Sequence, residues 1–257
     1  MGWPDERPDH IEKISTAAGI AIRRWRLSGA EFRRYLDQAH YPSSYHGGSA
    51  APEPAFYEKA LEHFVSLALI DPHRGEVLID VASHGGPFAE IAESAFGCVT
   101  YHQDLAFPPG VNGRFIGGDA ADMPVPDGFA DLMTLHCSYD HFEGPSDMGF
   151  AREAGRVLRP GGRAVVVPLY LSDTFGVKTD PQLRRRSIPI DPGMRRFLIP
   201  GLRVEFSRVY DPHRLAERVL APAREAGLVC EVVRVEGVTE TVPQGYCHYA
   251  LVLHRPG

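Results

Sequence analysis

Short apolar runs alternate with longer amphipathic segments from residue 77 to the end of the chain. Runs of about four to eight residues separated by helical periodicity are typical of a doubly wound parallel sheet. The last two runs are joined by residues 236–245, too few for a helix, and should form an antiparallel hairpin. The expected strands are residues 77–82, 98–102, 113–118, 130–136, 164–170, 229–235 and 247–253, and the expected helices lie near 88–95, 148–158 and 212–226.

The pattern before residue 77 is helical. Residues 20–36 carry spaced apolar side chains among many arginines, and residues 56–69 carry apolar side chains on one face of a helix. A turn-rich loop at residues 41–49 separates them. We therefore expect an N-terminal helical cap over residues 1–74 and an α/β domain over residues 75–257.

One connection is too long for a minimal sheet of this kind. Residues 171–211, after the fifth expected strand, contain several arginines and prolines. Long connections are usually functional, so we expect a lid over the carboxyl edge of the sheet. The run Arg184, Arg185 and Arg186 could bind an anionic group of a ligand through forked hydrogen bonds, or it could be a solvated helix face.

Composition narrows the class of protein. A hydrophobic content of 44% and a charged content of 23% in 257 residues are ordinary for a globular protein. The net charge of −6 gives no reason to expect a nucleic acid partner. No apolar run approaches the ~18 residues of a membrane span, and the polar start is no secretory signal. The four cysteines have no paired spacing, which favours reduced thiols in a cytoplasmic protein.

Two segments in the middle of the chain carry a family resemblance. Residues 119–133 are a short acidic turn, a proline-marked loop and an apolar strand that opens on an acid. Residues 153–162 are a helix that stops at Pro-Gly-Gly and feeds the apolar run 163–169. In this order and at this distance they resemble the middle of class I S-adenosylmethionine (SAM)-dependent methyltransferases, and the resemblance covers about residues 75 to 257.

The resemblance implies a seven-stranded, mostly parallel α/β sheet whose last strand is antiparallel. It implies SAM as the cofactor and methyl transfer to a small-molecule hydroxyl or amine, plausibly in sugar or specialised-metabolite biosynthesis. The partner would be a small-molecule acceptor, with an anionic acceptor and a homodimer both left open.

The glycine-rich first motif of the family is altered in this chain. Asp80 and Gly86 fall on family positions, whereas Ala82 and His84 replace two glycines. Those glycines normally adopt positive φ beside the methionine portion of SAM. We expect the His84 imidazole to lie where the amino-acid end or the sulfonium of the cofactor would be.

Two acids match the adenosine-binding positions of the family. Asp104, after the second expected strand, corresponds to the acid that binds the ribose hydroxyls. Asp119 corresponds to the acid that accepts from the adenine amino group, and Ala120 would supply a backbone amide to the ring. His136, at the tip of the fourth expected strand, completes the predicted cofactor-binding residues.

Histidines gather at the expected carboxyl ends of the strands, and three interpretations remain open. They could line a polar pocket, or His136, Asp140 and His141 could hold a divalent metal. One histidine could instead be the base that removes a proton from the acceptor, with His141 the first candidate and His136 the second. Tyr170, at the tip of the fifth strand, would orient the acceptor.

Two other functions compete with methyl transfer. The chain could be an enzyme of the same fold that uses the histidines, with or without a metal, for other chemistry. It could also be a non-catalytic partner subunit, because replaced motif glycines are typical of such relatives.

Overall fold

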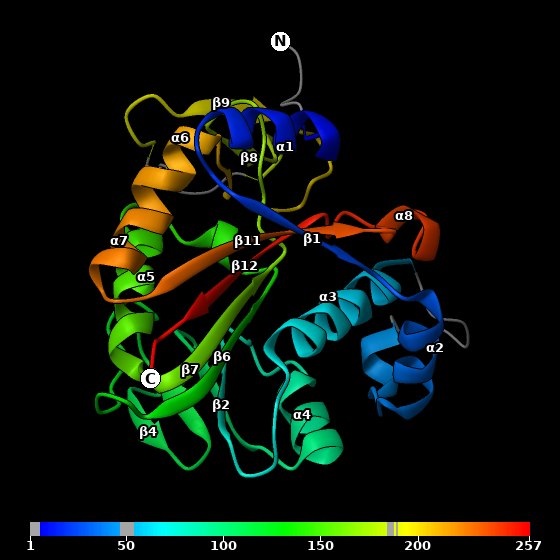
Figure 1. The fold of residues 1–257 in the computed structure, drawn as a ribbon, viewed down its shortest axis with the longest axis vertical. Helices are drawn as coiled ribbons and strands as arrows, with labels where there is room; N and C mark the ends of the chain where they lie inside the picture. Colours follow the sequence, from blue (N-terminus) through cyan, green and yellow to red (C-terminus); the bar gives the residue numbers. More distant parts are fainter. Residues whose placement is uncertain (1–5, 47–53, 184–187, 189) are drawn as a thin grey trace.

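The computed structural model describes residues 6–46, 54–183, 188 and 190–257. Its centre is a nine-stranded sheet with helices on both faces (Figure 1). The strands, in their order across the sheet, are β1 (Ile22–Arg26), β11 (Val229–Glu236), β12 (Tyr249–His254), β7 (Leu158–Val167), β6 (Ala130–His136), β2 (Val77–Val81), β3 (Val99–Asp104), β5 (Phe115–Gly117) and β4 (Gly110–Asn112).

The helices form two layers around this sheet (Figure 1). One layer holds α3 (Pro54–Ile70) and α4 (Phe88–Phe96), with α2 (Gly29–Gln38) packed on α3. The other holds α5 (Ser146–Val157) and α7 (Ala221–Glu225), and a π-helical turn over Ala216–Leu220 joins α7 to α6 (Pro212–Leu215). The remaining helical segments are α1 (Pro8–Ala17), α8 (Val238–Thr241) and the 3-10 turns η1 (Ser43–His46) and η2 (Tyr139–His141).

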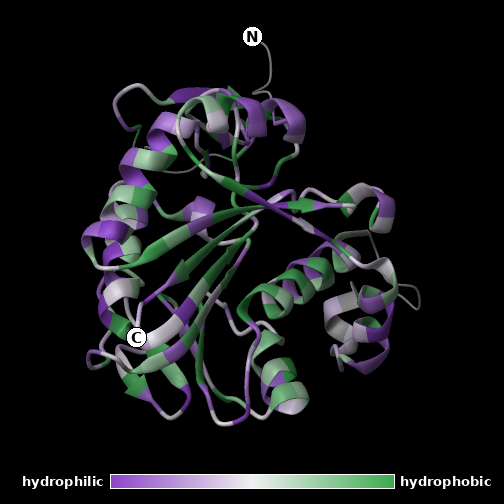
Figure 2. Ribbon diagram, in the orientation of Figure 1, coloured by the Kyte–Doolittle hydropathy of each residue, from purple (hydrophilic) through white to green (hydrophobic). Residues whose placement is uncertain are grey.

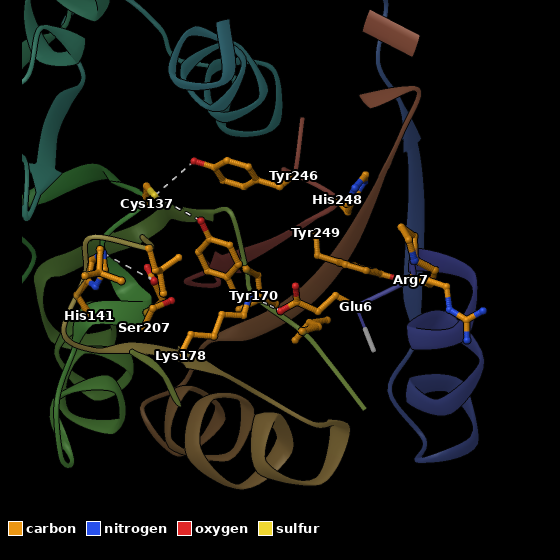
Figure 3. Close-up of a pocket in the computed structure, with 16 residues that line it drawn as sticks. Glu6, Arg7, Cys137, His141, Tyr170, Lys178, Ser207, Tyr246, His248 and Tyr249 are labelled. Atoms are coloured by element: carbon orange, nitrogen blue, oxygen red, sulfur yellow. Dashed lines mark hydrogen bonds and ion pairs between the residues drawn. The ribbon is translucent and has the colours of Figure 1, made fainter. Parts of the chain in front are cut away.

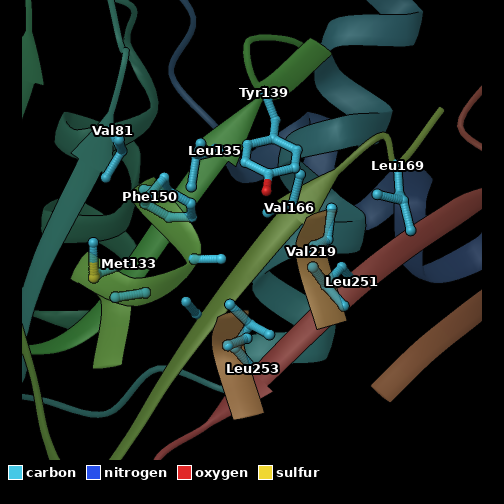
Figure 4. Close-up of a cluster of buried hydrophobic side chains, with 14 of the residues drawn as sticks. Val81, Met133, Leu135, Tyr139, Phe150, Val166, Leu169, Val219, Leu251 and Leu253 are labelled. Carbon is cyan, nitrogen blue, oxygen red and sulfur yellow. The ribbon is translucent and has the colours of Figure 1, made fainter. Parts of the chain in front are cut away.

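The central strands are apolar on both faces because both faces are covered. In β6, Met133 and Leu135 join the core on the α5 side, shown in Figure 4, and Leu132 joins the core under α3 and α4. In β7, Val166 joins the core on the α5 side, and Val165 joins the core under α3 and α4. Figure 2 shows the resulting hydrophobic strands at the centre of the molecule.

The predicted α/β fold is confirmed. Strands β2, β3, β5, β6 and β7 run parallel, and β12 pairs antiparallel with both β7 and β11. The sheet has two strands more than the seven expected, β1 at one edge and β4 at the other. The hairpin of β11 and β12 is also confirmed, although its connection contains the single-turn helix α8, which we did not expect.

The helix predicted over residues 20–36 is wrong. Ile22–Arg26 forms β1, which pairs in parallel with β11, and a separate helix, α2, begins at Gly29. The Ser28 hydroxyl caps this helix by accepting a hydrogen bond from the Glu31 N–H. Pairing with the sheet edge overrides the local helical periodicity, because β-branched and aromatic residues suit a half-buried strand.

The segment predicted as a lid contains a second sheet of three strands. These are β8 (Gly176–Thr179), β9 (Arg195–Leu198) and β10 (Ser207–Val209), and β8 lies between the other two. The fully buried Arg208 side chain ties β10 to α5 through Asp147, at 2.9 Å. Residues 184–186, the predicted anion-binding arginines, lie outside the described residues, and the lid role stays a prediction.

We find no helix among the described residues that is long and apolar enough to cross a membrane.

Candidate functional site

The turn after β2 has the positive φ angles that glycine usually adopts, although Ala82 and His84 stand at these positions. Ala82 and His84 have φ of 51° and 47°, in the left-handed region that costs an L-residue roughly 1–2 kcal/mol. The His84 N–H donates to Asp104 Oδ2 at 2.9 Å, which fixes the turn against the end of β3. The His84 side chain is exposed, and its place at the amino-acid end or the sulfonium of the cofactor stays a prediction.

A cavity of about 340 Å³ opens at the carboxyl ends of β2, β3 and β5, and we call it the cofactor cavity. Four predicted cofactor-binding residues meet there: Ala82, Asp104, Asp119 and Ala120. The others, Asp80, His84, Gly86 and His136, are not among its lining residues. The cavity is completed by Gln103, Leu105, His141, Phe142, Glu143 and Ser146.

Two acids of the cofactor cavity, Asp104 and Asp119, keep acceptor sites for a ligand. Asp104 Oδ1 accepts from the Ala106 N–H, and Asp119 Oδ1 accepts from the Ala121 N–H, both at 2.9 Å. An ionised carboxylate offers about four acceptor sites, so each can also accept from a ligand hydroxyl or amino group. This donor and acceptor pattern fits the ribose and adenine of SAM.

Gln103 is a residue of this cavity that the sequence analysis missed. Its side chain accepts from the Ala82 N–H at 3.2 Å and donates to the Gly118 carbonyl at 2.6 Å. The buried amide therefore joins the turn after β2 to the end of β5 and holds the two sides of the cavity together.

Asp80 and His136 form a buried pair, and neither residue lines the cofactor cavity. Asp80 Oδ1 lies 3.2 Å from His136 Nδ1 and accepts from the Thr134 hydroxyl at 3.2 Å. Burial raises the pKa of Asp80 to about 7 and lowers the pKa of His136 to about 3. The His136 ring packs against Phe88 and His63, with centroids 4.2 and 4.8 Å away, so it has no access to an acceptor.

The predicted metal site has no support. No group of three His, Cys, Asp or Glu residues in the described part of the chain could hold a metal ion. His136 is buried under α3 and α4, whereas His141 and Asp140 face a cavity, and the structure does not bring the three together.

A larger cavity, of about 750 Å³, lies beside the end of β6 (Figure 3). The predicted residues Asp140, His141 and Tyr170 line it. The sequence analysis did not assign the rest to a site, because they come from distant segments of the chain. These are Glu6, Arg7, Pro8, Cys137, Leu169, Leu171, Lys178, Leu202, Val204, Ser207, Tyr246, His248 and Tyr249.

His141 lines both cavities. Its Nδ1 lies 2.5 Å from the Phe206 carbonyl oxygen, which can only accept, so we assign the ring proton to Nδ1. Nε2 then carries a lone pair, and it lies 3.8 Å from Asp140 Oδ2. This arrangement can take up a proton at Nε2 and stabilise the resulting cation through the Asp140 carboxylate.

Three polar side chains form the floor of the larger cavity: Cys137 and Tyr170 are half-buried, and Tyr246 is exposed. Cys137 Sγ lies 3.4 Å from the Tyr170 hydroxyl and 3.9 Å from the Tyr246 hydroxyl (Figure 3). The Tyr246 hydroxyl donates to Glu62 at 3.3 Å, and Lys59 Nζ donates to both Glu62 oxygens at 3.0 and 3.1 Å. Burial raises the pKa of Tyr170 and of Cys137, so Tyr170 stays protonated and cannot serve as a base.

Residues 6–8 of the N-terminal segment line the larger cavity, and Figure 3 shows Glu6 near Lys178 and Tyr170. Lys178 pairs with Glu6, and its ammonium lies 5.5 Å from the centre of the Tyr170 ring. The Tyr249 hydroxyl donates to the Pro8 carbonyl at 2.6 Å. These contacts hold the N-terminal segment against one side of the cavity.

Comparison with known proteins supports the fold. Residues 89–166 match the family model described as a methyltransferase domain. The 1,6-didemethyltoxoflavin-N1-methyltransferase of Burkholderia thailandensis, solved with 1,6-didemethyltoxoflavin and S-adenosylhomocysteine, has a TM-score of 0.50 and 17% identity, covering 90% of this chain and 92% of that chain. The PH0226 protein of Pyrococcus horikoshii OT3 has a TM-score of 0.51 and 19% identity, covering 84% and 96%. A search of curated proteins gives no significant match.

The chain therefore has the class I methyltransferase fold, as the sequence predicted. The domain match, which lies between α4 and β7, supports methyl transfer from SAM as the general activity.

Proposed function

We propose that this chain transfers the methyl group of SAM to a hydroxyl or amine of a small molecule, in sugar or specialised-metabolite biosynthesis. One observation carries the proposal: His141 lines both the cofactor cavity and the larger cavity. A donor in the first and an acceptor in the second would meet at this residue. Holding two reactants in line accounts for much of the rate in such a transfer.

The cofactor cavity supplies groups suited to SAM, which carries an electrophilic methyl group when bound. Asp104 would accept from the ribose hydroxyls and Asp119 from the adenine amino group. The Ala120 backbone N–H would contact the ring, and the left-handed turn at Ala82 would lie beside the methionine portion.

His141 would act as the base. As the acceptor oxygen bonds to the methyl carbon and the sulfur–carbon bond breaks, the hydroxyl proton passes to His141 Nε2. The Phe206 carbonyl keeps the other ring nitrogen protonated, and Asp140 stabilises the imidazolium. Tyr170, whose pKa is raised by burial, would orient the acceptor as a hydrogen-bond donor.

The proposed partner is a small-molecule acceptor, without a nucleic acid or a membrane. The Burkholderia protein was solved with 1,6-didemethyltoxoflavin, a small molecule, and the larger cavity here, about 750 Å³, is in the range of drug-sized ligand sites. A homodimer is compatible with the proposal and is not needed by it.

Calorimetry with SAM and S-adenosylhomocysteine, followed by mass spectrometry of hydroxylated and amino acceptors, tests the proposal. We expect both compounds to bind with micromolar affinity and at least one acceptor to gain a methyl group. Failure of both compounds to bind would contradict the proposal.

A further inference from the structure

The walls of the larger cavity suit a flat apolar molecule. The rings of Tyr170 and Tyr246 stack with centroids 6.0 Å apart and an interplanar angle of 26°. Leu169, Leu171 and Leu202 line the same space. Aromatic and aliphatic walls bind ring systems through apolar contact, and they place few demands on charge.

The floor of this cavity is polar, but its two hydroxyl groups face a thiol, which is a weak hydrogen-bonding partner. The hydroxyls of Tyr170 and Tyr246 both face Cys137 Sγ, at 3.4 and 3.9 Å (Figure 3). A thiol is a weak donor and a weak acceptor, so Cys137 is a weak partner for the half-buried Tyr170 hydroxyl and for the lone pairs of the Tyr246 hydroxyl. An oxygen atom of a ligand would be a better partner for these hydroxyls than the sulfur is.

The two hydroxyls offer different groups to a ligand. Tyr246 donates its proton to Glu62, so its lone pairs remain for the cavity. Tyr170 keeps its proton for donation, because burial raises its pKa. One acceptor and one donor together match a hydroxyl group, which both donates and accepts. A carboxylate, which only accepts, would leave Tyr246 without a donor.

Two carboxylates and one ammonium lie behind the floor. Lys59 Nζ donates to both oxygens of the fully buried Glu62 carboxylate, at 3.0 and 3.1 Å. Glu58 accepts from the Tyr246 backbone N–H at 3.2 Å, and burial raises its pKa to about 7. Above the Glu62 pKa of about 8 both carboxylates are ionised beside one ammonium, which favours a neutral ligand group over an anionic one.

We propose that Tyr170 and Tyr246 bind a second hydroxyl group of an aromatic acceptor, on the floor of the larger cavity beside Cys137. The acceptor class is then a neutral aromatic compound with two hydroxyls, one at His141 and one at the floor. This inference rests on the proposed function for its assignment of the cavity to the acceptor.

The test compares ligands that differ by one hydroxyl. Probes are the para,para′ and para,meta′ isomers of dihydroxybiphenyl, para-phenylphenol, and the para′-carboxylate of para-phenylphenol. They are titrated by calorimetry with S-adenosylhomocysteine present, above the Glu62 pKa of about 8. We expect at least one diol to bind about 5- to 30-fold more tightly than para-phenylphenol, from two neutral hydrogen bonds. The carboxylate should have no such advantage.

Three conservative variants assign the effect. Tyr170→Phe and Tyr246→Phe keep the rings, and each should lower the ratio of diol affinity to para-phenylphenol affinity about threefold or more. Tyr249→Phe is the matched control, because Tyr249 lines the same cavity but its hydroxyl donates to Pro8. This variant should leave the diol advantage unchanged.

Several outcomes would overturn the proposal. These are no binding of any probe, no diol advantage, an advantage that survives in both Tyr170→Phe and Tyr246→Phe, or an equal loss for the diol and para-phenylphenol. Failure of methyl transfer is separate. If S-adenosylhomocysteine does not bind and the diol advantage still depends on the two hydroxyls, the floor site stands and the proposed function falls.

Discussion

The cofactor cavity and the larger cavity are built in different ways. The cofactor cavity is formed by residues 82–146, at the ends of β2, β3 and β5 and in the segment that follows β6. The larger cavity gathers side chains from Glu6 to Tyr249, on segments that meet only in the folded protein. In the proposed function, the donor would therefore bind at the edge of the sheet, and the acceptor would bind among distant segments of the chain.

The two cavities also differ in charge. The cofactor cavity has three carboxylates, Asp104, Asp119 and Glu143, and the first two are suited to the hydroxyl and amino donors of a nucleoside. The floor of the larger cavity has two phenols and a thiol whose pKa values are raised, at Tyr170, Tyr246 and Cys137. His141 is the residue common to both linings, and substitutions on either side should separate donor binding from acceptor chemistry.

The largest effect is expected from His141→Ala. Loss of the base should lower kcat by about 100- to 10,000-fold, measured with the best acceptor from the screen. Affinity for S-adenosylhomocysteine should change far less, because the Asp104 and Asp119 carboxylates remain. His213→Ala, on an exposed histidine, is the control. A large loss of affinity with little change in kcat would make His141 a binding residue.

Asp80→Asn should alter the pH dependence of stability. Burial raises the pKa of Asp80 to about 7 in the folded protein, from about 3.9 in the unfolded chain. The unfolded state then binds fewer protons between these values, so the wild-type free energy of unfolding falls as pH rises through this window. In the variant, the free energy of unfolding should fall by up to about 4 kcal/mol less than in the wild type over this pH window.

The measurement for Asp80→Asn is chemical denaturation at about pH 4.5 and pH 8, on either side of the Asp80 pKa. His63 and His136, whose pKa values are lowered by burial, act in the opposite direction in both proteins, so the wild type serves as the reference for the variant. Parallel pH profiles would contradict the account. Affinity for S-adenosylhomocysteine should be retained, because Asp80 is not among the residues that line the cofactor cavity.

Asp104→Asn and Asp119→Asn should each weaken S-adenosylhomocysteine binding by about 10- to 150-fold, through loss of a charge-assisted hydrogen bond of about 1.5–3 kcal/mol. Calorimetry gives the affinity directly. Asp122→Asn is the matched control, because Asp122 is an exposed acid three residues from Asp119. Unchanged affinity in both variants would mean that the donor binds elsewhere.

The smallest effect is expected from Lys178→Gln in the lining of the larger cavity. Its ion pair with Glu6 is partly exposed, and such pairs contribute about 1 kcal/mol or less, so KM for the acceptor should change at most about fivefold. Glu6→Gln should give the same change, and donor affinity should stay constant in both. A large change in donor affinity would contradict the separation of the two cavities.

The sequence predicted one of these cavities far better than the other. Asp104 and Asp119 could be assigned because they match the adenosine-binding acids of the class I methyltransferases, which the chain resembles. Tyr246 and Lys178 carry no local signal, because their neighbours in space are distant in the chain. His136 was misjudged because a strand tip was taken to be open, whereas its ring packs under α3.

The fold was predictable for a similar reason. The central strands are buried on both faces, so their sequence reads as continuous apolar runs. β1 gave no such run, since only its pairing with β11 makes Ile22–Arg26 a strand. The left-handed turn at Ala82 and His84 was not evident from the sequence, because neither residue is the glycine that usually adopts this conformation.

The most direct test of the account is the position of S-adenosylhomocysteine in a structure of the complex. We predict that its ribose lies at Asp104, its adenine at Asp119, and its sulfur beside His141, facing the larger cavity. Binding of the compound within the larger cavity, or with its sulfur remote from His141, would contradict the claim that the two cavities form one methyl-transfer site.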